Sequence, residues 1–326
     1  MIIFTYVVLF FLVIRFSVTL FNFLSNPKLP HFRQRLDGLV SVVIQVKNEE
    51  SNLLNLLEAL RQQDYRNLEI MISHAGLDLT DPALSDPQIR FVAQPEGNTD
   101  LSLLVPHVNG DYMLFLDSNT TIQKGFIYSL IYRAEVFNQP VIAVIPNQNP
   151  KGILQKLVLP LQDFVLLNLI PLRVIKMLKG VTLVSLRKDC LFFKAAAFEN
   201  YSTLAFPVEV LLANKMAWST NGQDRQRILN NATSVFKRNM AGNLLSAIFY
   251  VFLVVAGPVI IGFGVDPYLL ILPAGLIFLT RIMVSFLTAQ HPVRNLLLHP
   301  LQMLMLGVLL MRAISKQLLT RGQHKR

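Results

Sequence analysis

Long apolar runs lie toward both ends of the chain, and shorter ones alternate with polar residues between them. The first run, Ile2–Leu24, would form a helix of about 34 Å, enough to cross a bilayer. Basic residues follow this run rather than precede it, so we expect an uncleaved anchor and not a secretory signal. Arg15 inside it should face a neighbouring helix, because lipid exposure is costly. Three more apolar runs follow later: Leu244–Phe263, Tyr268–Leu287 and Asn295–Ala313.

The positive residues predict the orientation of these helices. Basic residues flank the middle of the chain on both sides: Lys28, Arg33, Arg35, Lys237 and Arg238. By the positive-inside rule the middle of the chain is expected on the cytoplasmic side. The basic tail after residue 311 also belongs inside, whereas a full crossing by Asn295–Ala313 would place it outside. Pro300 interrupts that run, so either the segment is re-entrant or interfacial, or the charge rule fails here.

The middle of the chain alternates short β-branched runs with helical patterns. Leu39–Val46 predicts a buried strand, and Ser51–Gln63 predicts an amphipathic helix with leucines at helical spacing. Alternating strands and helices indicate an α/β fold with a mostly parallel sheet and ligands at the carboxyl ends of the strands. The further strands are expected at Leu68–Ser73, Ile89–Ala93, Tyr112–Leu116 and Val141–Ile145.

Residues 154–178 are harder to assign. They mix leucines with basic residues, and Pro160 and Pro171 are expected to cut them into short helices. Helices lying in the membrane interface and ordinary core helices of the domain are both compatible with this pattern.

Composition supports a membrane protein. Charged residues make up 15% of the chain, against about 25% in a typical soluble protein. The single cysteine, Cys190, excludes an internal disulfide and a multi-cysteine zinc site. The net charge of +10 is concentrated at the borders of the apolar runs, so it indicates anionic lipid as a partner and not nucleic acid.

Four segments, in order, resemble the family-2 glycosyltransferases. Val40–Glu50 (VSVVIQVKNEE), with the helix and strand after it, resembles the family's opening, and Gly110–Asp117 (GDYMLFLD) resembles the strand that enters its Asp-x-Asp motif. Gly180–Phe198 is similar to the segment that binds the acceptor. Arg225–Arg227 (RQR) is similar to the start of the Gln-x-x-Arg-Trp motif. The order and spacing agree over nearly the whole chain.

The resemblance implies an A-type glycosyltransferase fold, a nucleotide-sugar donor, a divalent metal (Mg²⁺ or Mn²⁺) and a lipid or polysaccharide acceptor at the membrane. It divides the chain into an anchor at 1–26, a cytoplasmic transferase-like domain at 27–240, and a membrane region of two or three helices with a basic tail at 241–326. The expected location is the cell membrane, with several crossings.

The resemblance also implies a nucleotide site after the first two strands. Its candidates are Gln45, Lys47, Asn48, Glu49 and His74. Where the family has two acids after the second strand, this chain has His74 and Ala75. Asn48 and Glu49 could equally cap the helix that follows, and a lone histidine is more often incidental than a base-binding group.

The metal site implied by the Asp-x-Asp motif consists of Asp117 and Asn119. An amide oxygen can bind Mg²⁺ or Mn²⁺ but carries no negative charge, so weaker metal binding is expected. The alternative is that Asp117 simply ends a strand and Ser118 and Asn119 form a turn.

The family's catalytic base and diphosphate site are less complete. Phe206–Val208 occupy the place of the expected acids, and Glu209, at the start of a predicted helix, is the nearest substitute base. Arg225, Gln226 and Arg227 could contact the diphosphate or acceptor, but the family's Arg and Trp are replaced by Leu229 and Asn230. These arginines could instead bind lipid headgroups.

Three functions therefore stay open. The first is a membrane-bound transferase that moves a sugar from a nucleotide sugar to a lipid or glycan. The second is a catalytically inactive relative that serves as a scaffold or protein partner of an active transferase. The third is a sensor that binds a nucleotide or a lipid headgroup.

Overall fold

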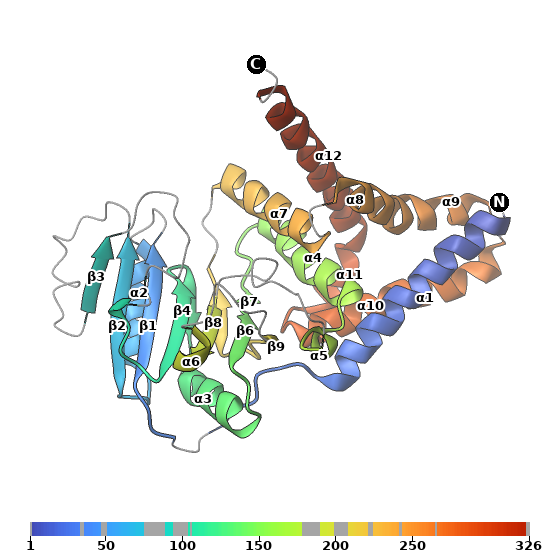
Figure 1. The fold of residues 1–326 in the computed structure, drawn as a ribbon. Helices are drawn as coiled ribbons and strands as arrows, with labels where there is room; N and C mark the ends of the chain where they lie inside the picture. Colours follow the sequence, from blue (N-terminus) through green and yellow to red (C-terminus); the bar gives the residue numbers. More distant parts are fainter. Residues whose placement is uncertain are drawn as a thin grey trace. The chain divides into compact units, whose positions relative to one another are not determined.

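The computed structural model describes residues 2–32, 36–46, 51–74, 89–93, 104, 106–177, 190–198, 208–220, 224–240, 243–264 and 266–323 (Figure 1). The chain divides into two compact units. The sheet unit contains Pro27–Asn149 and Leu172–Thr220, and the helical unit contains Met1–Asn26, Pro150–Pro171 and Asn221–Arg326. Residues 150–171 and 221–240, which we expected in the transferase domain, thus group with the helices.

The sheet unit is built on a seven-stranded sheet. Within this sheet only β8 (Cys190–Lys194) runs antiparallel to its neighbours, and the other strand pairs are parallel, which confirms the predicted mostly parallel α/β fold. A small second sheet has the order β5 (Thr120–Ile122), β10 (Ala217–Ser219), β7 (Asn147–Gln148). The order in the large sheet is β3 (Ile89–Ala93), β2 (Leu68–His74), β1 (Val40–Val46), β4 (Tyr112–Asp117), β8 (Cys190–Lys194), β6 (Val141–Ile145), β9 (Val208–Leu212).

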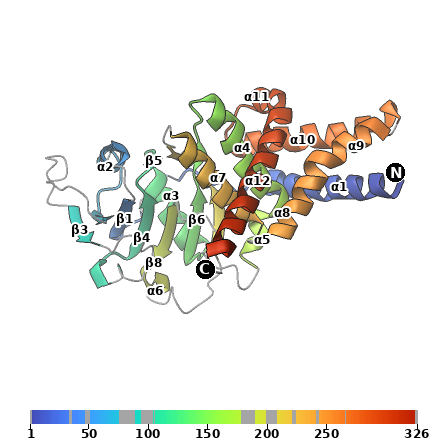
Figure 2. The same cartoon turned by 90° about the horizontal axis from the view of Figure 1, so that it is seen from above.

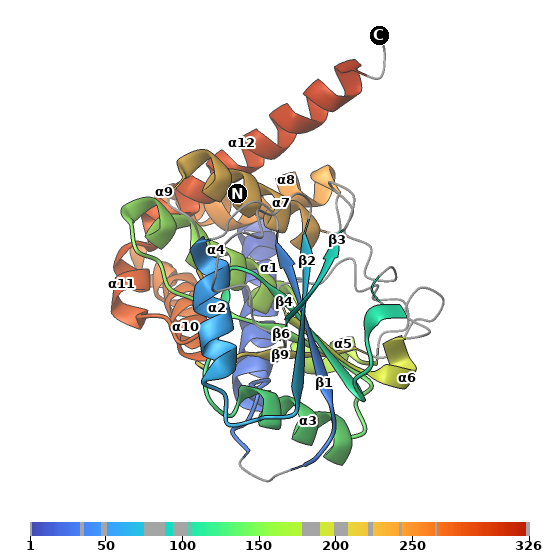
Figure 3. The same ribbon diagram turned by 90° about the vertical axis from the view of Figure 1, so that its left-hand side faces the viewer.

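Two helices, α2 (Ser51–Arg61) and α3 (Phe126–Val136), supply the apolar cover of one sheet face. The leucines spaced along α2 and the apolar face of α3 are buried with alternate residues of β1, because a strand turns every second side chain to the same side. Figure 3 shows α2 lying along the sheet. The residues of α2 and β1 in this buried cluster are Leu53, Leu56, Leu57, Leu60, Val40, Val42, Ile44 and Val46. Two short helices complete this unit, α5 (Leu172–Ile175) and α6 (Ala195–Phe198).

Gly110 lets β4 approach β1 closely. A Cβ atom at this position would lie 2.5 Å from the hydroxyl oxygen of Ser41 and 2.8 Å from the carbonyl oxygen of Leu39. The Gly110 amide donates to the Ser41 hydroxyl at 2.9 Å. Because any side chain would meet backbone atoms here, the glycine of the GDYMLFLD segment keeps β4, and the Asp117 at its end, beside β1.

The prediction that a helix begins near Glu209 is wrong. Val208–Leu212 forms strand β9, which pairs with β6 in parallel and stands at one end of the sheet order. Its other edge is covered by residues 27–29, since the Leu29 amide donates to the Leu212 carbonyl and the Leu212 amide donates to the Pro27 carbonyl, both at 2.8 Å. The short apolar run VEVLL has no helical period, and pairing on both edges decides its structure.

Among the described residues, three helices are long and apolar enough to cross a membrane: Ile2–Ser25, Leu244–Gly264 and Pro267–Leu287. The first is α1. The second combines α8 (Leu244–Val251), the π-helical turn η4 (Phe252–Ala256) and α9 (Gly257–Gly264). Pro258 follows the wide turn, which relieves the clash between a proline ring and the carbonyl four residues earlier. The third combines the 3₁₀ turn η5 (Pro267–Leu270) and α10 (Ile271–Leu287).

The expectation that Pro160 breaks residues 154–178 is also wrong. One helix, α4 (Ile153–Leu169), runs through Pro160 and is buried in the helical unit. It packs there against α1, α7 (Arg225–Asn239), α10 and α12 (His299–Gln323). Proline leaves the carbonyl of Lys156 without its helical donor. The side-chain amide of Gln302 donates to that carbonyl at 3.0 Å instead. This substitute bond explains how the helix continues, while Pro171 does separate α4 from α5.

The last apolar run forms two helices, α11 (Pro292–Leu297) and α12 (His299–Gln323). Pro300 does not interrupt α12, because it lies in the helix's first turn, where the missing amide hydrogen has no helical partner in any case. Figure 2 shows α12 from a second direction.

Candidate functional site

The carboxyl ends of three parallel strands bring predicted site residues to one edge of the sheet. Gln45 on β1 is paired in register with Asp117 on β4, and the next residue of β1 is paired with His74 on β2. The amide after Asp117 donates to the Gln45 carbonyl at 3.3 Å. The parallel pairing therefore gathers Gln45, His74 and Asp117 at the edge where α/β proteins bind ligands. Lys47, Asn48 and Glu49 lie outside the described residues.

Asp117 and Asn119 are joined by hydrogen bonds. Oδ1 of Asp117 accepts from the backbone amide and from the side-chain amide of Asn119, each at 3.0 Å. The side-chain oxygen of Asn119 accepts from the side-chain amide of Asn52, at the start of α2, at 2.7 Å. These hydrogen bonds, from Asn52 to Asn119 and from Asn119 to Asp117, fix the orientation of the Asn119 amide and hold the Asp117 carboxylate at the end of β4.

The donor atoms of this group fit a hard divalent cation. One carboxylate and one amide oxygen are the ligand types that Mg²⁺ and Mn²⁺ prefer, and such ions are often held by one or two protein groups together with substrate phosphates. Within the described residues, no group of three or more His, Cys, Asp or Glu is placed to hold a metal. In the part of the chain that the structure describes, Asp117 is the one carboxylate of the Asp117–Asn119 pair that could bind such an ion.

His74 ends β2 beside an aromatic side chain. Its imidazole meets the ring of Phe91 on β3 edge to face, with the ring centres 6.1 Å apart. Both side chains are half-buried. At the end of β2 the chain therefore presents two half-buried rings, one polar and one apolar, at a steep angle to each other.

The small sheet borders the Asp117–Asn119 segment. β5, which starts directly after Asn119, pairs with β10. The amide of Thr220, just after β10, donates to the carbonyl of Asn119 at 2.7 Å. Trp218, the single tryptophan, lies on β10 opposite Thr121. The fluorescence of Trp218 can therefore report on the neighbourhood of the candidate site.

Glu209 is held in a buried ion pair. Its carboxylate accepts from Nε of Arg133 at 2.7 Å and from Nη2 of the same guanidinium, and a third bond of 2.9 Å comes from Nη1 of Arg173. The Glu209 side chain is 3% exposed. Burial and the nearby charge of Arg133 lower the pKa of Arg173, and Glu209 opposes that effect. Two cations around one carboxylate favour a structural role over the predicted role as base.

Arg225, Gln226 and Arg227 form the first turn of α7, in the helical unit. Asp224 caps this helix: its two carboxylate oxygens accept from the amides of Gln226, at 3.0 Å, and Arg227, at 3.2 Å. The cap uses backbone donors that a bound phosphate could otherwise take. The exposed Arg225 side chain remains a candidate for anion binding.

A separate polar cluster lies inside the helical unit. The ring of Phe164 on α4 lies between two buried guanidinium groups, 5.1 Å from that of Arg15 and 4.8 Å from that of Arg281. Nε of Arg15 donates to the side-chain oxygen of Asn168 at 3.3 Å, and the Tyr250 hydroxyl donates to the same atom at 3.0 Å. The expectation that Arg15 faces neighbouring helices is confirmed.

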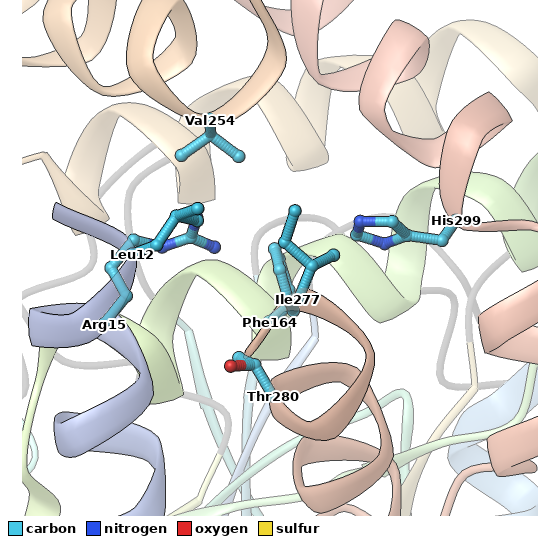
Figure 4. Close-up of a pocket in the computed structure, with 7 residues that line it drawn as sticks. All are labelled: Leu12, Arg15, Phe164, Val254, Ile277, Thr280 and His299. Carbon is cyan, nitrogen blue, oxygen red and sulfur yellow. The ribbon is translucent and has the colours of Figure 1, made fainter. Parts of the chain in front are cut away.

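A cavity of about 10 Å³ adjoins this cluster, close to the smallest volume that holds one water molecule. In Figure 4 the side chains of Arg15 and His299 point toward it from opposite sides. The cavity is too small for a sugar or a headgroup, so it belongs to the interior of the helical unit rather than to a substrate site. Its lining residues are Leu12, Arg15, Phe164, Val254, Ile277, Thr280 and His299.

Asn52, Arg133 and Arg173, which bond to candidate site residues, were not predicted from the sequence. Asn52 could have been suspected, because it follows the Asn-Glu pair at the start of a predicted helix. Arg133 and Arg173 carried no local signal, since they lie 76 and 36 residues from Glu209 and meet it only in the fold.

Comparisons with known proteins find a family match and similar solved structures. Residues 41–161 match the family model for glycosyl transferase family 2, and no curated protein matches the chain. The similar solved structures include the mannosyltransferase PcManGT from Pyrobaculum calidifontis, in complex with GDP-Man and Mn²⁺, at 11% identity and a TM-score of 0.48, covering 97% of this chain and 99% of that one. They also include S. aureus TarS with UDP-GlcNAc, at 12% identity and a TM-score of 0.40, covering 86% and 91%.

These two likenesses are too distant to carry an argument about substrate. The family match covers the segment that contains β1, α2, β2 and the Asp117–Asn119 group, and the observed sheet is mostly parallel with ligand-type residues at its carboxyl edge. Residues 41–161 therefore match a family-2 glycosyltransferase domain on a mostly parallel α/β sheet, and the chain also contains helices that are apolar and long enough to cross a membrane.

Proposed function

We propose that the protein is a membrane-bound glycosyltransferase that moves a sugar from a nucleotide-sugar donor to a lipid or polysaccharide acceptor. The observation that carries this proposal is the position of Asp117. Its carboxylate lies at the carboxyl edge of the sheet, inside the family match, and is oriented by Asn119 and Asn52.

In this proposal the nucleotide binds across the ends of β1 and β2. Gln45 and His74 offer hydrogen-bonding groups at that edge, and His74 with Phe91 offers a surface on which a base can stack. Lys47, Asn48 and Glu49 follow β1 in the chain and are retained as candidates on the family resemblance alone.

A divalent ion, Mg²⁺ or Mn²⁺, is the proposed cofactor, with Asp117 and Asn119 as its protein ligands. When bound, such an ion stabilises the negative charge that develops on a diphosphate leaving group. Arg225 and Arg227 are proposed to contact the diphosphate or acceptor through forked hydrogen bonds. Glu209 stays the nearest acid in sequence to the family's base, although its two arginine partners argue against that role.

The proposed location is the cell membrane, with α1, the α8–α9 helix and α10 as spans. The transferase domain, proposed as residues 27–240, is proposed to lie on the cytoplasmic side, and the basic residues on both sides of the chain's middle support this orientation. An acceptor anchored in the membrane is then within reach of the domain. No nucleic acid partner is proposed.

The test is donor turnover by the purified full chain in detergent, using UDP- and GDP-sugars with Mn²⁺ or Mg²⁺. Release of nucleoside diphosphate that needs metal and is lost in Asp117→Ala would support the proposal. Asp37→Asn, which removes a carboxylate from an exposed position, serves as the charge control and should retain turnover. The proposal is wrong if no donor binds and none is turned over.

A second candidate function is supported by the environment of Glu209. With the nearest acid held by two arginines, the chain could be an inactive relative that acts as a membrane scaffold or as a partner of an active transferase. Titration calorimetry with nucleotide sugars separates the possibilities. Binding without turnover indicates a sensor, neither binding nor turnover indicates a scaffold, and turnover excludes both.

A further inference from the structure

The outer face of α12 is apolar although its inner face is held by protein. Leu301, Leu304, Val308 and Met311 recur at alternating spacings of three and four residues, so they lie on one stripe of the helix. They are between 46% and 65% exposed. Gln302 on the inner face bonds to the carbonyl of Lys156 on α4 and to Arg281 on α10.

Length and charge argue against a crossing by α12. Its residues before the first charged side chain, 299–311, extend about 20 Å as a helix, whereas the hydrocarbon core of a bilayer is about 30 Å thick. Its remaining residues include Arg312, Lys316 and Arg321, and the whole helix contains no Asp or Glu. An apolar stripe combined with basic residues is typical of a helix that lies on an anionic lipid surface.

The direction of α12 agrees with this assignment. In Figure 1, α12 runs across the directions of α1, α9 and α10 rather than along them. It packs against α4, α7 and α8. Its contacts with the second candidate span are mainly with α8 and η4, residues 244–256, which form the part of that span nearest to α7 in the sequence.

We propose that α12 lies in the cytoplasmic interface of the membrane. Its stripe of Leu301, Leu304, Val308 and Met311 enters the acyl region. Arg312 donates to the side-chain oxygen of Asn230 on α7 at 3.1 Å, and Lys316 and the basic residues that follow it in the sequence contact anionic phospholipid headgroups. The chain then crosses the bilayer three times, and the basic tail stays in the cytoplasm, as the charge rule requires. The inference rests on the proposed membrane location of the helical unit and is independent of transferase activity.

The first test measures depth in the bilayer. Single cysteines replace Leu301, Leu304, Val308 or Met311 in a full-length Cys190→Ala background, carry a small fluorophore, and are reconstituted with phosphatidylcholine and phosphatidylglycerol. Lipids with quenchers at shallow or deep positions then report depth. The same labels at Leu272, Phe278 and Phe286, exposed positions along the proposed span α10, provide the matched control.

The expected result is one shallow depth for all four α12 positions and a clear gradient of depth along α10. A gradient along α12 like that of α10 would overturn the proposal, because a crossing helix changes depth by about 1.5 Å per residue.

The second test determines on which side the C-terminus lies. A reporter that works only in the cytoplasm and one that works only after export are fused in turn to Arg326. Signal from the cytoplasmic reporter supports three crossings, and signal from the exported one overturns them. Alkaline carbonate extraction is run in parallel. Release of the chain would overturn the membrane location itself, whereas an exported tail on a retained chain overturns only the placement of α12.

Discussion

Arg133 and Glu209, on α3 and β9, form a buried ion pair in which one guanidinium donates to both oxygens of one carboxylate. Ile142 of β6 is the register partner of Glu209, so the pair joins a helix to the outer part of the sheet. Arg173, just before the middle of α5, adds a third bond. These bonds favour a structural role for Glu209 over a role as catalytic base, and variants of Glu209 can test this.

Glu209→Gln is expected to destabilise the sheet unit by about 3 kcal/mol, because it leaves buried guanidinium charge without its counter-charge. Unfolding by denaturant in detergent, followed through the fluorescence of Trp218, measures the change. The double variant Arg133→Leu/Glu209→Leu should lose less stability than the sum of the losses in Arg133→Leu and in Glu209→Leu. In each single variant one charged partner of the pair stays buried without the other, and in the double variant both are removed.

Nucleotide-sugar binding of Glu209→Gln should stay near the wild-type level. Loss of turnover with unchanged stability would instead show that Glu209 acts as the base and that the ion pair matters little to folding.

Asn119→Asp is expected to tighten Mn²⁺ binding about tenfold, because a second carboxylate adds a charged oxygen ligand. The same substitution removes the bond from the Asn119 side chain to Asp117 and places two carboxylates together. The free energy of unfolding of the metal-free variant should therefore be about 1 kcal/mol lower than that of the wild type. The variant should unfold at a lower denaturant concentration as a result.

Calorimetry with Mn²⁺ and unfolding with and without the ion measure both effects. Asp37→Asn is the control, as it should alter neither. Equal Mn²⁺ affinity in Asn119→Asp and the wild type would count against Asn119 as a ligand position.

Gly110→Ala is expected to cost about 2–3 kcal/mol, because the added methyl meets the backbone of Leu39 and Ser41, which cannot rotate away. Gly152→Ala is the matched control: no atom lies within 4 Å of its added methyl, and its backbone conformation is extended. Thermal unfolding of the two variants should differ by several degrees. Equal melting temperatures would mean that β4 does not depend on this close approach.

Glu69 is expected to make the free energy of unfolding fall at acidic pH. Burial by itself raises its pKa, but hydrogen bonds from Ser41 and Asn109 and the charge of Arg90 outweigh burial, so the pKa lies below its ordinary value. A carboxyl with a lowered folded pKa stabilises the protein above its unfolded pKa, and this contribution is lost as the pH falls through the folded pKa.

Glu69→Gln should therefore be less stable than the wild type at pH 7 and should lose less stability between pH 5 and pH 3. Unfolding midpoints followed through Trp218 over that range test the prediction. Parallel pH curves for the two proteins would show that Glu69 does not titrate differently in the folded state.

Much of the sheet was predictable because its strands are short, continuous and β-branched. The predicted strands at 89–93 and 141–145 have the observed bounds, and the others differ by one residue at an end. The apolar helices at 2–25 and 267–287 were equally predictable, because each is a continuous apolar run of 20 residues or more. Local pattern suffices where an element is long or strongly periodic.

Ambiguous segments were decided by distant partners. Val208–Leu212 became a strand because β6 and residues 27–29 occupy its two edges, and α4 continues through Pro160 because Gln302, far along the chain, satisfies the freed carbonyl. Neither partner is visible within the segment itself.

The sequence by itself determined the α/β class, the apolar helices and the position of Asp117 at a strand end, because each follows from periodicity or motif order. Only the tertiary structure decided that Asn52 orients Asn119, that Arg133 and Arg173 neutralise Glu209, and that α12 keeps an apolar face uncovered. The physical reason is that hydrogen bonds and ion pairs depend on distances in space, and residues far apart in the chain acquire those distances only when the sheet and the helices are assembled.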